Sequence, residues 1–172
     1  MSVTLDDLNG RSLEGFISVC GPLFEHSPWV AERTWPRRPF ATREALCREL
    51  LSTLAGASEK EKLDLISAHP DLVGRLARQG KVTAESAREQ AAAGLDSVTP
   101  AEAELFEQYN LTYRRKFGFP FIICARENRK NAILDAFPRR LKNSREAELA
   151  AALQEIGRIA RLRLEDAVTE EG

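Results

Sequence analysis

Apolar residues recur three and four positions apart along almost the whole chain, whereas strict alternation of apolar and polar residues is almost absent. The first spacing gathers apolar side chains on one face of an α-helix, and alternation would be typical of a half-buried strand. The sequence therefore predicts an all-α fold. Its 172 residues suffice for one domain that buries about two-thirds of its unfolded surface. We expect a single domain over residues 1–172, a bundle of about seven to nine helices.

Helix boundaries can be predicted from capping residues. Ser12, Thr42, Ser58 and Thr83 each stand before a segment with helical spacing, where a side-chain oxygen can cap the first turn. Residues 99–102, Thr-Pro-Ala-Glu, form a capping-box pattern with proline at the first helical position. The predicted helices cover residues 13–23, 43–54, 59–68, 84–93, 100–117, 131–137 and 145–168, the last capped by Asn143 or Ser144.

Three segments depart from that spacing. Pro70 disfavours a helical conformation at His69, so the helix over residues 59–68 should end there. Residues 119–124 form an apolar, partly β-branched run, which fits a short buried strand or a helical turn. Residues 33–39 contain two prolines and are expected to form an ordered irregular loop.

Composition excludes several classes of function. The formal net charge is −1, which offers no electrostatic surface for nucleic acid. No apolar run approaches the roughly 18 residues that span a bilayer, and the start of the chain has no signal-peptide pattern, so we expect no membrane association. Cys20, Cys47 and Cys124 are widely spaced, which predicts buried thiols in a reducing compartment and a cytoplasmic protein.

The sequence also lacks the residue sets of metal and nucleotide enzymes. Its two histidines, His26 and His69, cannot supply the usual histidine-rich catalytic set, and no cysteine pair has zinc-site spacing. A nucleophile elbow, a phosphate loop and a dinucleotide-binding fingerprint are absent as well. We therefore expect neither a metal nor a cofactor.

Arg163 lies on the apolar face of the last predicted helix. At about 100° per residue, it falls within the arc of four apolar side chains. These are Leu149, Leu153, Ile156 and Ala160. An arginine cannot lose its proton inside a protein, so a partly buried one needs acceptors. Arg163 could form a structural salt bridge, or its aliphatic chain could extend so that the charge reaches the surface. Alternatively, its guanidinium group could bind substrate oxygens.

Three polar residues share one face of the helix predicted over residues 84–93. Ser86, Glu89 and Gln90 stand at positions i, i+3 and i+4. One interpretation is structural, because Ser86-x-x-Glu89 also fits a capping box and a polar face on a short helix is usually solvated. The other is that this face lines a site.

His69 is the stronger histidine candidate for catalysis. It ends a helix and is followed by Pro70, where a rigid element meets a loop, and histidine titrates near neutral pH. A lone histidine is also often structural. His26 lies in a similar segment and ranks second, as a residue that ties a loop.

Five strings of residues, in this order, resemble one known family over almost the whole chain. They are residues 24–31 (Phe-Glu-His-Ser-Pro-Trp-Val-Ala), 69–74 (His-Pro-Asp-Leu-Val-Gly), 85–90 (Glu-Ser-Ala-Arg-Glu-Gln) with 93–96 (Ala-Gly-Leu-Asp), 116–123 (Lys-Phe-Gly-Phe-Pro-Phe-Ile-Ile), and 152–156 (Ala-Leu-Gln-Glu-Ile) with Arg163-Leu164. Together they are similar to the OHCU decarboxylases, which convert 2-oxo-4-hydroxy-4-carboxy-5-ureidoimidazoline into (S)-allantoin during urate degradation.

The resemblance implies an all-helical single domain, usually a homodimer, that uses no cofactor. It assigns His69 and Glu89 to catalysis. It also implies a set of substrate contacts, which are Pro70, Ser86, Gln90, Arg163 and the backbone around Phe121, Ile122 and Ile123. The ureidoimidazoline would be the small-molecule partner.

The alternative is that the chain is not an enzyme but a helical module that binds another protein. In that case Arg163 forms a salt bridge in the core, and the loop with Trp29, Trp35 and Phe40 binds a partner protein. Convergence of the candidate residues at an accessible His69 would favour the enzyme.

Overall fold

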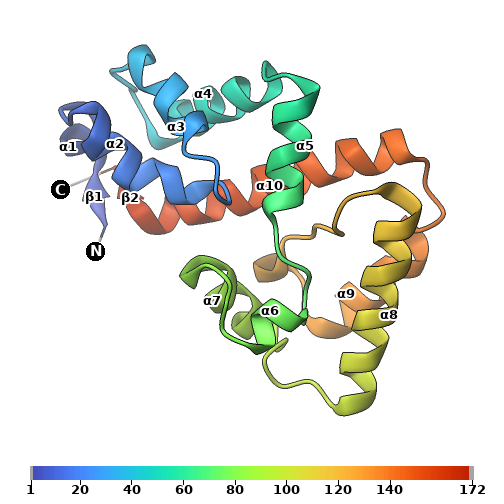
Figure 1. Cartoon of the computed structure of the whole chain (residues 1–172). Coiled ribbons are helices and arrows are strands. Elements are labelled where there is room, and N and C mark those ends of the chain that lie inside the picture. The colour runs from blue at the N-terminus through green and yellow to red at the C-terminus, as the bar shows by residue number, and fades with distance from the viewer. Residues whose placement is uncertain (1, 171–172) are drawn as a thin grey trace. The chain divides into compact units, whose positions relative to one another are not determined.

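The computed structural model describes residues 2–170 and is mostly helical (Figure 1). The all-α prediction is therefore confirmed. The described chain divides into two compact units: unit 1 comprises the residues up to Leu65 together with those from Gly157 onward, and unit 2 is Ile66–Ile156. The boundary falls within two helices, α5 (Glu59–Ala68) and α10 (Arg145–Ala167). That the whole chain forms one domain stays a prediction.

Unit 1 contains the short helices of the first third of the chain and one pair of strands. Its helices are α1 (Leu5–Asn9), α2 (Leu13–Cys20), α3 (Trp29–Thr34) and α4 (Arg43–Ala55), with the 3₁₀ turns η1 (Gly21–Leu23) and η2 (Trp35–Arg37). Strands β1 (Val3–Thr4) and β2 (Val168–Thr169) pair in parallel, with Val3 opposite Val168.

Unit 2 is built from five elements besides its parts of α5 and α10. They are α6 (Arg75–Arg78), α7 (Ala84–Ala92), α8 (Pro100–Phe117), η3 (Ala125–Glu127) and α9 (Lys130–Arg140). Across residues 2–170, no helix is both long enough and apolar enough to cross a membrane.

The predicted caps begin the helices as expected. The side-chain oxygens of Ser12, Thr42 and Thr83 accept hydrogen bonds from backbone N–H groups three residues later, at 3.0 to 3.2 Å. Thr99 opens α8 with a complete capping box. Gly118 ends the same helix with a φ of 82°, a conformation that glycine adopts without steric penalty.

Three boundary predictions need correction. The helix from Ser12 ends at Cys20 rather than residue 23, because residues 21–23, with Pro22, tighten into η1. Residues 33–39 are not an irregular loop throughout, since α3 extends to Thr34 and η2 follows. Residues 120–124 are neither strand nor helical turn but buried irregular backbone. The short helices α1, α3 and α6 were not predicted.

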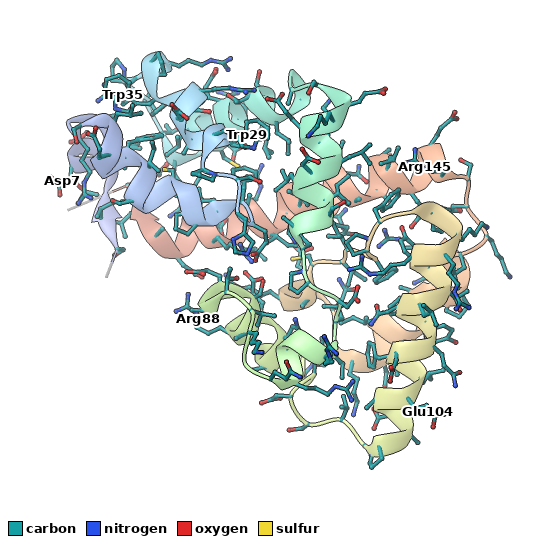
Figure 2. All side chains as sticks on the ribbon, viewed as in Figure 1. Asp7, Trp29, Trp35, Arg88, Glu104 and Arg145 are labelled. Carbon is teal, nitrogen blue, oxygen red and sulfur yellow. The ribbon has the colours of Figure 1, made fainter. Side chains whose placement is uncertain are left out.

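The loop proposed as a partner-binding surface is largely packed within unit 1. Phe40 is buried and stacks on Phe16, with ring centroids 6.2 Å apart. Trp29 and Trp35, labelled in Figure 2, are half-buried. The Arg38 guanidinium carbon lies 4.0 Å from the centroid of the Trp35 ring. The loop therefore does not present three exposed aromatic side chains.

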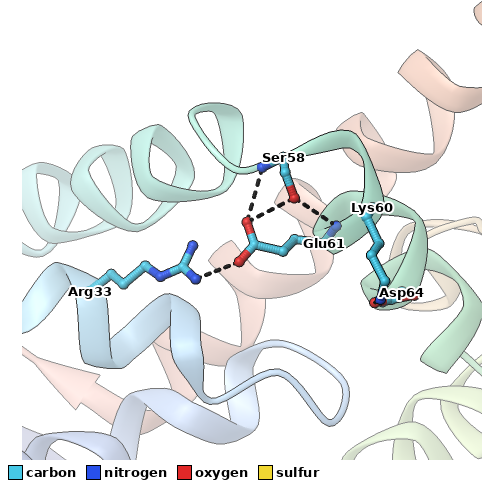
Figure 3. A network of polar contacts seen from close by, with 5 residues as sticks. All are labelled: Arg33, Ser58, Lys60, Glu61 and Asp64. Carbon is cyan, nitrogen blue, oxygen red and sulfur yellow. Dashed lines mark hydrogen bonds and ion pairs between the residues drawn. The ribbon is translucent and has the colours of Figure 1, made fainter.

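A polar network on the surface of unit 1 joins α3 to the start of α5 (Figure 3). The Glu61 carboxylate accepts hydrogen bonds from Arg33 and from the Ser58 N–H, and Ser58 in turn caps α5 through the Glu61 N–H. The Arg33 hydrogen bond, followed by that of Ser58, lowers the pKa of Glu61 to about 2. Ser58 therefore begins α5 as predicted.

Unit 2 has an aromatic core next to a buried polar network. Phe121 stacks on Phe137 with centroids 3.9 Å apart. The fully buried Glu148 carboxylate accepts hydrogen bonds from the Tyr113 hydroxyl at 2.5 Å, Arg140 Nε at 2.8 Å and Asn143 Nδ2 at 3.0 Å. Burial and the hydrogen bond to Glu148 raise the pKa of Tyr113. All three of these hydrogen bonds therefore depend on the Glu148 carboxylate.

Replacing Glu148 should therefore destabilise the protein strongly. Glu148→Ala leaves the Arg140 charge, whose side chain is 13% exposed, without its carboxylate, and breaking a buried pair in this way typically costs about 3 to 5 kcal/mol. Urea denaturation monitored by circular dichroism would measure the loss. Lys60→Ala, which removes an exposed ion pair with Asp64, is the control and should leave stability within experimental error. Equal stability of the two variants would contradict this account.

Candidate functional site

The first candidate residue, His69, lies where α5 ends. The last helical residue is Ala68, and the His69 N–H donates to the Ile66 carbonyl at 3.2 Å. Helix termination before Pro70 is therefore confirmed. His69 is buried, at 7% exposed, so the solvent access that was expected to favour the enzyme is not seen at this residue.

Residues 69–74 form a tight turn that needs its glycine. The Gly74 N–H donates to the Asp71 carbonyl at 3.2 Å. A Cβ at Gly74 would lie 2.9 Å from Asp71 Cβ and 3.0 Å from the Asp71 carbonyl oxygen, closer than side chains tolerate. Asp71 is also held by Arg114 of α8, with Nε to Oδ1 at 2.9 Å.

The polar face of α7 is mostly buried rather than solvated. Ser86 and Gln90 are 6% and 7% exposed, and Glu89 is half-buried. The N-cap of α7 is Thr83, so Ser86 is the third helical residue and does not cap a turn toward Glu89. The structural interpretation of this face, a Ser86 capping box in solvent, is therefore wrong.

Gln90 connects α7 to the His69 segment. Its Oε1 atom accepts a hydrogen bond from the Val73 N–H at 3.1 Å, and both residues are buried. A backbone N–H can only donate, so the oxygen of the Gln90 side-chain amide must face Val73. The Nε2 group of the same amide then points away from Val73. Gln90 thus ties the His69 segment to the face that carries Ser86.

Residues 121–124 are buried and are held by side chains instead of a backbone ladder. Arg140 Nη1 donates to the Ile122 carbonyl, and Glu155 Oε2 accepts from the Cys124 N–H at 3.2 Å. The Phe121, Ile122 and Ile123 side chains are 1%, 3% and 8% exposed, so they belong to the core. Next along the chain, η3 packs against α7, and the Lys130 N–H donates to the Ala93 carbonyl at 3.1 Å.

Arg163 belongs to unit 1 and is buried, at 6% exposed, as its helical face predicts. Nη2 pairs with Glu25 Oε1 at 2.9 Å, and Nη1 donates to the Pro22 carbonyl at 3.1 Å. The structural salt bridge considered for this residue is therefore present. Glu25 is 2% exposed and was not identified from the sequence as its partner. His26 beside it is exposed, with a φ of 47°.

The structure brings together part of the predicted set. Gln90 is bonded to the segment that begins at His69, and Ser86 is buried on the same helix as Gln90. That Glu89 and Arg163 converge with them in one pocket stays a prediction. Within residues 2–170, no group of three or more His, Cys, Asp or Glu side chains is arranged to hold a metal.

One buried polar residue near the site was missed from the sequence. Asn110 of α8 is 5% exposed and donates from Nδ2 to the Leu72 carbonyl at 2.9 Å. It stands among the buried residues Phe106, Tyr113 and Phe117, at helical spacing. A polar residue on an apolar helix face, the signal that identified Arg163, could also have identified Asn110.

Comparison with known proteins shows the family to which the chain belongs. The OHCU decarboxylase family model matches residues 9–165. The chain belongs to the OHCU decarboxylase family. Over 164 residues it is 43% identical to the 2-oxo-4-hydroxy-4-carboxy-5-ureidoimidazoline decarboxylase of Halalkalicoccus jeotgali, covering 95% of this chain and 91% of that protein. The family resemblance seen in the sequence is thus confirmed, and membership makes the chain a carboxy-lyase.

Two further relatives are longer than this chain. The uric acid degradation bifunctional protein PucL of Bacillus subtilis is 40% identical over 169 residues, which cover 98% of this chain and 33% of that protein. A crystal structure of (S)-allantoin synthase superposes with a TM-score of 0.77 and 30% identity, covering 96% of this chain. This OHCU decarboxylase-family chain spans about half of that one, 54%.

Proposed function

We propose that the protein decarboxylates 2-oxo-4-hydroxy-4-carboxy-5-ureidoimidazoline to (S)-allantoin, without a cofactor, in urate degradation. The names of its relatives support this substrate and product. The observation that carries the proposal is the hydrogen bond from the Val73 N–H to Gln90, because it joins the His69 segment to the polar face of α7. The resemblance assigns both to one active site.

Decarboxylation of this substrate requires few catalytic groups from the protein. Loss of carbon dioxide leaves an electron pair on carbon, and most decarboxylases use a cofactor to accept it. Here the imine beside the carboxylated carbon accepts the pair. The pair forms a double bond between the two ring carbons, and the hydroxyl on the formerly carboxylated carbon loses its proton as that carbon becomes a carbonyl. The protein must hold the ureido and ring oxygens, and it must deliver a proton to one face of the ureido-bearing carbon so that only the (S) product forms.

His69 and Glu89 are the residues proposed for proton transfer. His69 would take the proton of the substrate hydroxyl or anchor the departing carboxylate, and a positioned acid or base typically contributes about 100- to 10,000-fold. Glu89, half-buried on α7, would orient His69, hold the ureido group or relay the proton.

The remaining proposed residues bind the substrate. Gln90 would present its Nε2 group to a substrate oxygen, since its Oε1 is bonded to Val73. Ser86, Pro70 and the backbone of residues 121–123 would complete the contacts. Arg163 would hold substrate oxygens with its charged donors; that assignment rests on the resemblance, because its two Nη groups bond Glu25 and Pro22.

The resemblance also supports a homodimer, which sedimentation equilibrium would test.

A cytoplasmic location, proposed from the widely spaced cysteines, can be tested by fractionating the source cells.

The direct test of the proposed function is to generate the unstable ureidoimidazoline enzymatically in situ. Optically active allantoin should form faster with the protein than without it, as followed by circular dichroism. Equal rates of (S)-allantoin formation in the two reactions would disprove the proposal.

His69→Asn should nearly abolish turnover while the fold is kept. Asparagine still forms hydrogen bonds but exchanges no proton near neutral pH, so we expect a loss of about 100-fold or more in kcat. His26→Asn is the matched control. His26 is exposed with a positive φ, which asparagine tolerates well, so that variant should keep both stability and turnover. Wild-type rates for His69→Asn would remove His69 from the mechanism.

Activity should survive exhaustive chelation and dialysis, because the substrate supplies its own electron acceptor and the sequence has only two histidines. The measurement compares kcat before and after treatment with EDTA. Loss of activity that a divalent metal restores would contradict the cofactor-free mechanism.

A further inference from the structure

The peptide unit between Leu72 and Val73 is held on both of its polar groups by buried amide side chains. Asn110 Nδ2 of α8 donates to the Leu72 carbonyl at 2.9 Å. Gln90 Oε1 of α7 accepts from the Val73 N–H at 3.1 Å. One peptide plane is therefore fixed between two different helices, by two side chains that are at most 7% exposed.

The residue after that peptide bond is strained. Val73 has a φ of 53°, a region that a β-branched side chain rarely occupies because its Cβ crowds the backbone. Such a conformation persists only where the surroundings over-determine it, and it is found mostly at functional sites. Rotation of the Leu72–Val73 peptide would relieve the strain, but it would break both amide hydrogen bonds at once.

The same peptide unit lies in the turn that positions His69. Residues 69–74 are short and closed by the Gly74 to Asp71 hydrogen bond, and Pro70 stiffens the backbone beside His69. A rotated peptide at residues 72–73 would therefore shift the turn as a whole. His69 would move with it relative to α7.

We infer that Asn110 is a positioning residue that, together with Gln90, clamps the Leu72–Val73 peptide and so holds His69 in its working position. The inference rests on the proposed function for the role of His69. In this role Asn110 acts through the turn, by its bond to the Leu72 carbonyl. Gln90 acts at both ends of its amide, with Oε1 on the turn and Nε2 toward the substrate.

The kinetic test is Asn110→Ala, measured as initial rates of (S)-allantoin formation from the ureidoimidazoline. We expect kcat to fall by about 10- to 100-fold, because a displacement of about 1 Å in a catalytic group has effects of that size. KM should change little, because in this role Asn110 acts on the turn and not on the substrate. Gln108→Ala is the matched control; it removes an exposed amide side chain of the same helix, which bonds Glu104 of that helix, and should keep kcat within about 2-fold.

A rescue variant separates positioning from a general packing defect. Glycine adopts a positive φ without strain, so Val73→Gly removes the tendency of the peptide to rotate. The double variant Asn110→Ala/Val73→Gly should recover most of the lost kcat. If Asn110→Ala does not fold, folding of the double variant supports the clamp, and failure of both to fold overturns it.

Amide hydrogen exchange provides a readout that does not depend on activity. The Val73 N–H should be protected in the wild type and in Gln108→Ala, and it should exchange faster in Asn110→Ala. Wild-type kcat and exchange in Asn110→Ala would overturn the clamp. A wild-type protein that forms no allantoin but shows the expected exchange pattern would instead overturn the proposed function and leave the clamp intact.

Discussion

Buried backbone outside helices and strands must find hydrogen-bond partners among side chains, and this constraint shapes unit 2. Unpaired backbone groups away from water are costly, so nearly all are satisfied. In the turn that follows α5, the Leu72–Val73 peptide bonds to Asn110 and Gln90. In the irregular segment after α8, the backbone at residues 122 and 124 bonds to Arg140 and Glu155. Helices α7 to α10 thus contribute the side chains that hold two non-helical segments.

Those two segments carry most of the positions that the resemblance assigns to catalysis and substrate contact. The proposed cofactor-free reaction depends on accurately placed proton donors, acceptors and charges, because orientation and electrostatic stabilisation then supply the rate enhancement. Irregular backbone permits a histidine and backbone groups to face a ligand, whereas helical backbone groups are already bonded to one another. Buried side chains of fixed length then give that backbone the rigidity that a helix would otherwise have. Arg140, which is held by Glu148, is one such support.

Much of the helical framework could be predicted because the residues that begin and end each helix act on their near neighbours in the sequence. Ser12, Thr42 and Thr83 mark helix starts through contacts three residues away, and Pro70 ends α5 through a steric effect on its neighbour. The burial of Arg163 followed from helical periodicity. The irregular course of residues 120–124 could not be predicted, since it is held by residues of α9 and α10. For the same reason, Glu25, which lies far from Arg163 in the sequence, emerged only from the structure. The place of Asn110 on an apolar helix face was visible in the sequence, but its bond to Leu72 was not.

The central claim is that His69, held by this framework, lies at the site where the ureido compound binds. The protein has only two histidines, so ¹⁵N-histidine labelling gives one candidate and one internal reference, the exposed His26. Titration with (S)-allantoin, followed by the ring nitrogen signals in NMR spectra, measures both at once. The account predicts a saturable shift of the His69 signals with those of His26 unchanged. Unchanged His69 signals at saturating (S)-allantoin, or equal shifts of both histidines, would contradict it.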